Sequence, residues 1–191
     1  MKKLKYILAS LLLASGFASC ESEEIDGKLN DENLQSKPVL RFDLNNNVTV
    51  VTDNISLNWG GDAFMITAKM QIKDDNAISA ETKYKAAKLD IYVSNLTMAN
   101  FPVMWENSQS LFFSTAVMEV QELDEDGKIM PVAYSTTNAP EGASPGFMNV
   151  SFISQESRYL NGNFDYTLYP PEGSIMQPQK LTKGEVHYIK Y

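Results

Sequence analysis

Hydrophobic and polar residues alternate along most of the chain from Val39 onward. Because successive side chains of a β-strand point to opposite faces of its sheet, a period of two predicts strands rather than helices. The run 157–169 shows this most clearly, with apolar residues on one parity and polar residues on the other, so we expect Phe164 and Tyr166 inward and Asp165 outward. Strands with one buried and one solvated face are typical of antiparallel sheets. The same parity rule groups Met148, Val150 and Phe152 on one face.

Turn-forming residues divide the alternating region into short segments. Clusters rich in Asn, Asp, Gly and Pro, such as 45–47, 74–76 and 138–146, interrupt the alternation. Asp126 followed by Gly127 is typical of a hairpin turn. The expected strands lie near 40–44, 48–59, 63–72, 86–96, 111–122, 131–136, 147–154, 157–169 and 181–190. This spacing predicts an all-β domain, an antiparallel β-sandwich of about nine strands, with a partly closed, lipocalin-like barrel as the alternative.

The N-terminal region follows a different pattern. Three lysines precede an apolar stretch at 7–18, and small residues follow it. A basic segment, a short apolar stretch and small residues before a cleavage position make up a secretory signal peptide. The stretch is too short for a spanning helix, which needs about 20 apolar residues. We therefore expect a signal peptide at 1–19, a flexible tether at 20–37 and a single all-β domain at 38–191.

The one cysteine follows the small residues directly, and it has no disulfide partner within the chain. The sequence Phe17-Ala18-Ser19-Cys20 resembles the lipobox of bacterial lipoprotein signals, although that family more often has an aliphatic residue where Phe17 stands. The resemblance implies cleavage before Cys20, a diacylglycerol on its sulfur, and attachment to a membrane through that lipid. Several acyl chains on one residue make a durable anchor.

An acidic run comes next, and it includes Glu21, Glu23 and Glu24. It resembles the export signal of surface lipoproteins of Bacteroidota. That resemblance implies an outer-membrane lipoprotein displayed on the cell surface. The alternative is a plain solvated leader on a protein that stays on the periplasmic face.

The C-terminal part contains two further motifs, G-x-F-x-Y-T at 162–167 and T-K-G at 182–184, and the chain closes on Tyr191. This ending is similar to that of small uncharacterised lipoproteins of Bacteroidota. The resemblance implies an all-β lipoprotein and assigns no catalytic residue.

Charge narrows the range of partners. The formal net charge is −8, and removing the three lysines of residues 1–19 with the signal would take it to −11. An acidic protein repels phosphate backbones, so we expect no nucleic-acid partner. The same charge disfavours electrostatic docking on anionic lipid.

One motif suggests catalysis. Residues 142–146 match G-x-S-x-G, and Asp165 and His187 follow in the order of α/β-hydrolases. However, Pro145 follows the serine, and proline lacks the backbone N–H that such enzymes use to bind the oxyanion. His187 is the only histidine and has no neighbours at metal-ligand spacing. We expect no enzyme activity, no catalytic residue, no metal site and no cofactor.

The apolar stretch 98–105 is the best candidate for a contact loop, with Phe101, Met104 and Trp105 as its contact residues. A displayed domain without catalytic groups is expected to be a binding or adhesive module for a protein or glycan. The alternatives are an accessory subunit of an outer-membrane assembly and a carrier of a small apolar ligand or haem. A pocket of several hundred Å³ would favour a carrier. A flat apolar patch near Trp105 would favour a larger partner.

Overall fold

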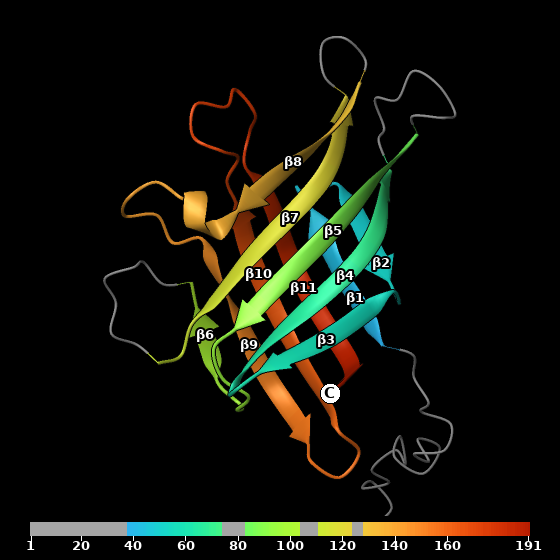
Figure 1. The fold of residues 1–191 in the computed structure, drawn as a ribbon, viewed down its shortest axis with the longest axis vertical. Coiled ribbons are helices and arrows are strands. Elements are labelled where there is room, and N and C mark those ends of the chain that lie inside the picture. Colours follow the sequence, from blue (N-terminus) through green and yellow to red (C-terminus); the bar gives the residue numbers. More distant parts are fainter. Residues whose placement is uncertain (1–37, 74–82, 104–110, 124–127) are drawn as a thin grey trace, which may run out of the picture. The chain divides into compact units, whose positions relative to one another are not determined.

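Two antiparallel β-sheets pack face to face in the C-terminal unit of the chain (Figure 1). The computed structural model describes residues 38–73, 83–103, 111–123 and 128–191. In this part of the chain the fold is all-β, and the sheets do not close into a barrel. The β-sandwich prediction is therefore confirmed over the lipocalin-like alternative.

The six-stranded sheet has the order β2-β1-β11-β10-β9-β6. Its central strands are the long C-terminal ones, and in Figure 1 it lies behind the other sheet. Its strands are β1 (Val39–Leu44), β2 (Val48–Thr52), β6 (Asn100–Pro102), β9 (Gly146–Ser154), β10 (Tyr159–Leu168) and β11 (Gln179–Lys190).

The five-stranded sheet has the order β3-β4-β5-β7-β8. Each neighbouring pair is antiparallel, as the alternating sequence predicts. Its strands are β3 (Ile55–Gly60), β4 (Ala63–Lys73), β5 (Tyr84–Val93), β7 (Ser114–Leu123) and β8 (Ile129–Ser135). A short 3-10 turn, Thr136–Asn138, follows β8.

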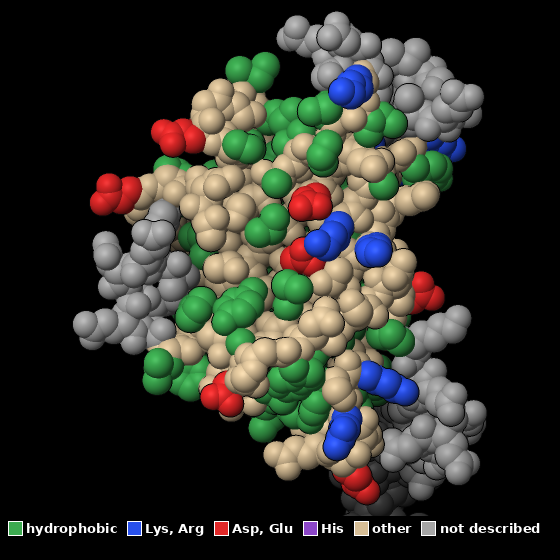
Figure 2. Space-filling model, in the orientation of Figure 1, with side chains coloured by type: hydrophobic (Ala, Val, Ile, Leu, Met, Phe, Trp, Pro, Cys, Tyr) green, Lys and Arg blue, Asp and Glu red, His purple; other side chains and the backbone are tan. Residues whose placement is uncertain are grey.

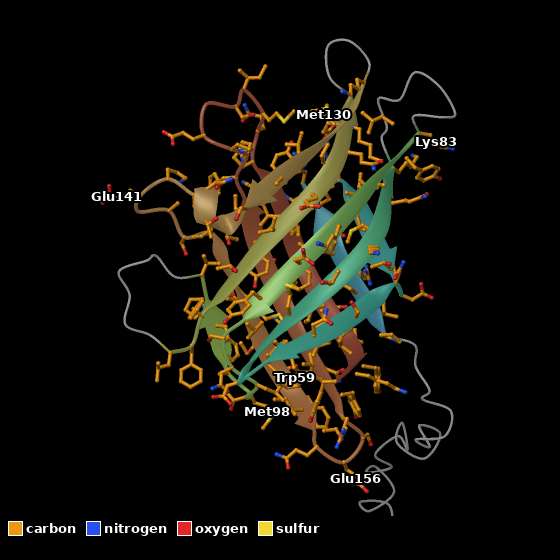
Figure 3. The ribbon with its side chains drawn as sticks, in the orientation of Figure 1. Trp59, Lys83, Met98, Met130, Glu141 and Glu156 are labelled. Carbon is orange, nitrogen blue, oxygen red and sulfur yellow. The ribbon has the colours of Figure 1, made fainter. Side chains whose placement is uncertain are left out.

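The core lies between the inner faces of the sheets and follows the predicted parity. Phe164 and Tyr166 are buried, as expected, while Asp165 lies on the outer face and is partly exposed. Phe42 packs against Phe164 with ring centroids 6.2 Å apart. Trp59 lies at one end of the sandwich (Figure 3). Its ring packs against that of Tyr191, with the two ring centroids 5.2 Å apart. Aromatic contacts of this kind add to the free energy gained from burying apolar area.

A buried chain of hydrogen bonds links the two sheets through the core. The Tyr166 hydroxyl on β10 donates to Ser114 Oγ on β7 at 2.9 Å. Ser114 Oγ in turn donates to the carbonyl of Phe101 on β6 at 2.7 Å. Burial raises the pKa of Tyr166 because the charged phenolate would lose its hydration.

The structure differs from the prediction at two places. The predicted strand 48–59 is divided at Asp53 and Asn54, where the chain passes from one sheet to the other. At this corner the Lys69 N–H donates to the Asn54 carbonyl at 2.9 Å. The short strand β6 was not predicted because three residues ending in Pro102 are too few to show alternation; Pro102 is tolerated because β6 is an edge strand.

Several sequence predictions lie outside the described residues. Residues 1–37 are not described. The signal, the lipidation at Cys20, the acidic run and the tether 20–37 therefore stay predictions, as does the hairpin turn at 124–127.

Candidate functional site

The predicted contact loop is only partly described, and one of its residues does not fit the prediction. Phe101 lies on β6 opposite Met148 of β9, and its side chain is 0% exposed. The prediction that Phe101 contacts a partner is therefore wrong, because pairing with β9 turns its ring into the core. Met104 and Trp105 lie outside the described residues.

An apolar patch nevertheless lies next to this loop. Leu111 is 80% exposed, and Phe112 and Tyr92 are also exposed. Figure 2 shows hydrophobic side chains gathered over the lower part of the face formed by the five-stranded sheet. Residues 104–110, which precede Leu111 in the sequence, lie outside the described residues.

A second group of aromatic side chains lies on the outer face of the six-stranded sheet. We call Phe152 of β9, Tyr159 of β10 and Tyr188 of β11 the aromatic row. The ring centroids of Phe152 and Tyr159 are 5.5 Å apart, and those of Tyr159 and Tyr188 are 4.9 Å apart. Neighbouring rings are tilted by only 34° and 37°, so the three form a continuous strip across three strands. Phe152 is 43% exposed, and both tyrosines are partly exposed.

Two β-bulges on either side of β10 bring the outer rings into the row. On β11, His187 and Tyr188 together lie opposite the single residue Asn161. On β9, the register with β10 also shifts by one residue at Asn161. A bulge adds a residue to one strand and reverses the parity beyond it. If the strands alternated without interruption, Phe152 and Tyr188 would face the core like Val150 and Val186. The bulges instead place both aromatic side chains on the outer face of the sheet.

The prediction that Phe152 shares a face with Met148 and Val150 is therefore wrong. A shared four-residue pattern marks both bulges in the sequence: a valine, a polar residue, an aromatic residue and an isoleucine. It occurs as Val150-Ser151-Phe152-Ile153 on β9 and as Val186-His187-Tyr188-Ile189 on β11. In both, the valine is buried and the aromatic residue is outside, while the isoleucine packs against the core.

The bulge on β11 requires an unusual backbone conformation. Tyr188 has φ of +52°, a left-handed conformation that bulky residues adopt only at some cost. The side chain of Asn161 stabilises the bulge, since its Oδ1 accepts the Tyr188 N–H at 2.7 Å. Strain of this size, about 1–3 kcal/mol per residue, persists where surrounding contacts enforce it and is common at binding sites.

The surroundings of the row are polar and include charged side chains, since the exposed Lys190 lies opposite Tyr159 in the register. His187 lies on the same face, with Nε2 3.5 Å from a carboxylate oxygen of Glu185. Further along the face, Asn149 Nδ2 donates to Asn163 Oδ1 at 2.9 Å. Amides and hydroxyls beside aromatic rings can both donate and accept hydrogen bonds. This part of the sheet therefore combines apolar rings with both charged and uncharged polar groups.

A pocket of about 380 Å³ opens between the sheets at the end away from the row. Leu44, Ile72 and Met118 form part of its apolar lining. Lys85 and Glu122, both on inward-facing positions, form an ion pair in it. Burial and the negative charge of Glu122 raise the pKa of the neighbouring Tyr134. The volume suits a small ligand, but a lining that includes an ion pair does not suit an apolar ligand or haem.

A larger and more open groove of about 900 Å³ runs across the five-stranded sheet to the corner at 51–54 and to Val39 of the other sheet. Lys69, Lys88 and Glu119 are among its lining residues, and Lys88 forms an ion pair with Asp90 at 2.6 Å. Figure 2 shows side chains of both charges close together near the middle of this face. Because its charges compensate one another, the groove does not select a ligand of one charge.

The residues of the G-x-S-x-G motif do not meet the histidine. The registers place Gly146 opposite Tyr166 and Val186 opposite Gly162 of the same strand, β10. Ser144 and His187 lie beyond these pairs in opposite directions. Four residues of a strand span about 13 Å, so the two side chains are too far apart for a nucleophile and its base. Asp165 instead accepts the Lys183 N–H through Oδ1 at 2.8 Å.

The described residues contain neither a metal-binding cluster nor a membrane-spanning helix. Across 38–73, 83–103, 111–123 and 128–191, no group of three or more His, Cys, Asp or Glu side chains is placed to hold a metal ion. Within the same ranges no helix is long and apolar enough to cross a membrane.

Comparison with protein families, with curated proteins and with solved structures finds no match to this chain. The geometry of the aromatic row and of the pocket is therefore the basis for a functional proposal.

Proposed function

We propose that the protein is a lipid-anchored, non-catalytic binding module, displayed on the cell surface, and that the aromatic row is its binding surface. The observation that supports this most is the placement of Phe152 and Tyr188. Two bulges place these rings on the outer face, where Phe152 is 43% exposed and Tyr188 is partly exposed, although fully burying a large apolar side chain would stabilise the fold by about 1.5–3 kcal/mol. Both strands next to β10 thus give up part of the free energy that burying an aromatic side chain would provide. A partner that covers this surface is the best explanation.

The anchor is the second part of the proposal. A diacylglycerol on Cys20 would hold the protein on the outer membrane, and residues 20–37 would connect it to β1, which begins at Val39. A chain of this length spans roughly 20–25 Å if it is flexible, since the distance grows as about 5–6 Å times the square root of the residue number. This reach is enough to hold a small domain clear of the lipid headgroups.

Photo-crosslinking in cells that display the full protein would test the row as a binding surface. A photoreactive phenylalanine analogue replaces Tyr159 in the centre of the row. The matched control replaces Tyr92, an exposed tyrosine on the outer face of the other sheet. We expect an adduct of higher mass from position 159 and none from position 92. Equal adducts from both positions, or none from position 159, would contradict the proposal.

A further inference from the structure

We infer that the pocket between the two sheets binds a free α-amino acid with an apolar side chain, and that Lys85 and Glu122 hold its two charged groups. The pocket lies at the end of the sandwich where β5 begins and β7 ends (Figure 1). The inference goes beyond the proposed function, because this site is separate from the aromatic row. Its basis is the position of the ion pair, the charges it can accept and the apolar residues beside it.

The ion pair occupies two positions that face the core. Lys85 has the same parity on β5 as the buried Leu89, and Glu122 has the same parity on β7 as the buried Val120. The two charged side chains are only 28% and 22% exposed. Apolar residues of similar volume often stabilise an enclosed position as well as an ion pair does, because they lose no hydration. A ligand with charges of its own therefore explains the pair better than stability does.

The ion pair favours a ligand that carries both charges. Glu122 repels a monoanion placed at Lys85, and Lys85 repels a monocation placed at Glu122. A zwitterion with its carboxylate at Lys85 and its ammonium at Glu122 gives every charge an opposite neighbour and forms charge-assisted hydrogen bonds. Because Lys85 Nζ and Glu122 Oε2 are in direct contact, the two ligand charges must also be adjacent. They are adjacent in a free α-amino acid and far apart at the two ends of a peptide.

The apolar part of the pocket suits the side chain of such a ligand. Leu44, Ile72 and Met118 line the pocket from three different strands and are themselves buried. The volume of about 380 Å³ is near the lower end of the range for small-ligand sites, about 300–1,000 Å³. Lys73 also lines the pocket, but it is exposed and has the opposite parity to Ile72. The pocket therefore has room for one large apolar side chain beside the ion pair.

The six-stranded sheet contributes neutral amides to the same pocket. Asn45 and Gln179 both line it, and Asn45 Nδ2 donates to Gln179 Oε1 at 2.7 Å. Asn45 Oδ1 also accepts the Lys180 N–H at 2.8 Å, which fixes the orientation of this amide. Amides add polarity without a net charge. They therefore leave the balance of charges at the ion pair unchanged.

Isothermal titration calorimetry of the full chain, kept in detergent, would measure binding of L-leucine, L-methionine and L-phenylalanine. Each has analogues that lack one charged group; for leucine, isocaproate lacks the ammonium and isoamylamine lacks the carboxylate. Glycine keeps both charges and lacks the apolar side chain. We expect at least one of the three amino acids to bind at one site per chain. Its two analogues and glycine should each bind at least tenfold more weakly.

Two double variants connect this binding to the ion pair. Lys85→Met combined with Glu122→Met replaces both charges with apolar side chains, so the protein should fold and bind the amino acid at least tenfold more weakly. Lys88→Met combined with Glu119→Met is the matched control, because these residues pair across the same two strands but have the outward parity. The control should bind as the parent protein does. Urea unfolding of both variants checks that they are folded.

Several outcomes would overturn the inference. It fails if none of the three amino acids binds, or if an analogue with a single charge binds as tightly as its amino acid. It also fails if the Lys85 and Glu122 double variant retains the affinity of the parent. If that variant does not fold, the comparison of analogues on the parent protein still decides the result. Photo-crosslinking at position 159 tests the aromatic row separately, so either proposal can fail without the other.

Discussion

Individual residues in this domain act through contacts that alternation does not reveal. Tyr166 is an inward residue by parity, but its hydroxyl needs a partner in the core, and Ser114 of the opposite sheet provides it. Ser114 Oγ in turn donates a hydrogen bond to the carbonyl of Phe101. Buried polar groups cost free energy unless they are hydrogen-bonded, so this chain of bonds favours one alignment of the two sheets.

Tyr166→Phe should lower the free energy of unfolding at pH 7 by about 1 kcal/mol, because one buried hydrogen bond is lost. It should also alter the dependence on pH. The folded protein holds the proton of Tyr166 more tightly than the unfolded chain, whose tyrosine has a pKa of 10.0. The stability due to this group is therefore complete below pH 10 and decreases as the pH rises above it. Urea unfolding at pH 7, 9, 10 and 11 should show a shallower alkaline loss for the variant. Parallel curves would contradict the assignment.

At the scale of one element, β11 is shaped by two bulges with the same construction. Lys183 and Tyr188 both have φ of +52°, and the amide N–H of each is accepted by a side chain of β10, Asp165 for the first and Asn161 for the second. Next to the first bulge, a Cβ on Gly184 would lie 2.4 Å from the ring of Phe164, so only glycine fits there. These side-chain acceptors hold a long strand in a bent, twisted form.

Substitutions of Asp165 should distinguish an acceptor from a charge. Asp165→Asn keeps a side-chain oxygen for the Lys183 N–H, so the free energy of unfolding should change by no more than about 0.5 kcal/mol. Asp165→Ala removes the acceptor and should cost about 1 kcal/mol, since the Lys183 N–H loses this hydrogen bond. Thermal or urea unfolding of the two variants measures the difference. An Asn variant as unstable as the Ala variant would mean that the charge, not the hydrogen bond, matters.

At the scale of the whole molecule, the central question is where the folded domain is held. The described residues contain no helix able to span a membrane, and the proposal places the anchor on Cys20. The proposal assigns attachment to Cys20 and display to the acidic run that follows it, and each can be tested with the full protein.

Cys20→Ala should abolish lipidation and release the protein from membranes, because the acyl chains provide the binding free energy, about 0.8 kcal/mol for each buried methylene. Metabolic labelling with a fatty-acid analogue, followed by membrane fractionation, measures both effects. A variant that is still labelled, or still sediments with membranes, would rule out this lipidation site.

Replacing Glu21, Glu23 and Glu24 together with Ala should leave lipidation intact but move the protein from the cell surface to the periplasmic face. Protease treatment of whole cells reports the change, since only a displayed domain is cut. The triple variant should resist the protease in intact cells and be cut after lysis. Equal cleavage of both proteins in intact cells would show that the acidic run is only a leader.

The sequence by itself determined the class of fold and most of its strands. Alternation is a local property, because each residue of a strand faces the opposite side from the one before it. It therefore placed eight of the predicted strands within a few residues of strands in the structure and turned Phe164 and Tyr166 inward. The same rule applies wherever no residue is added to or removed from a strand.

Only the tertiary structure decided which strands join which sheet and where the alternation breaks. The split of 48–59 between two sheets and the burial of Phe101 depend on pairing with strands far away in the sequence. The aromatic row depends on two register shifts opposite Asn161, one of them held by that residue's own side chain. Register is set by neighbours across a sheet, so parity along one strand predicted a buried Phe152, and only the paired strands show it at the surface.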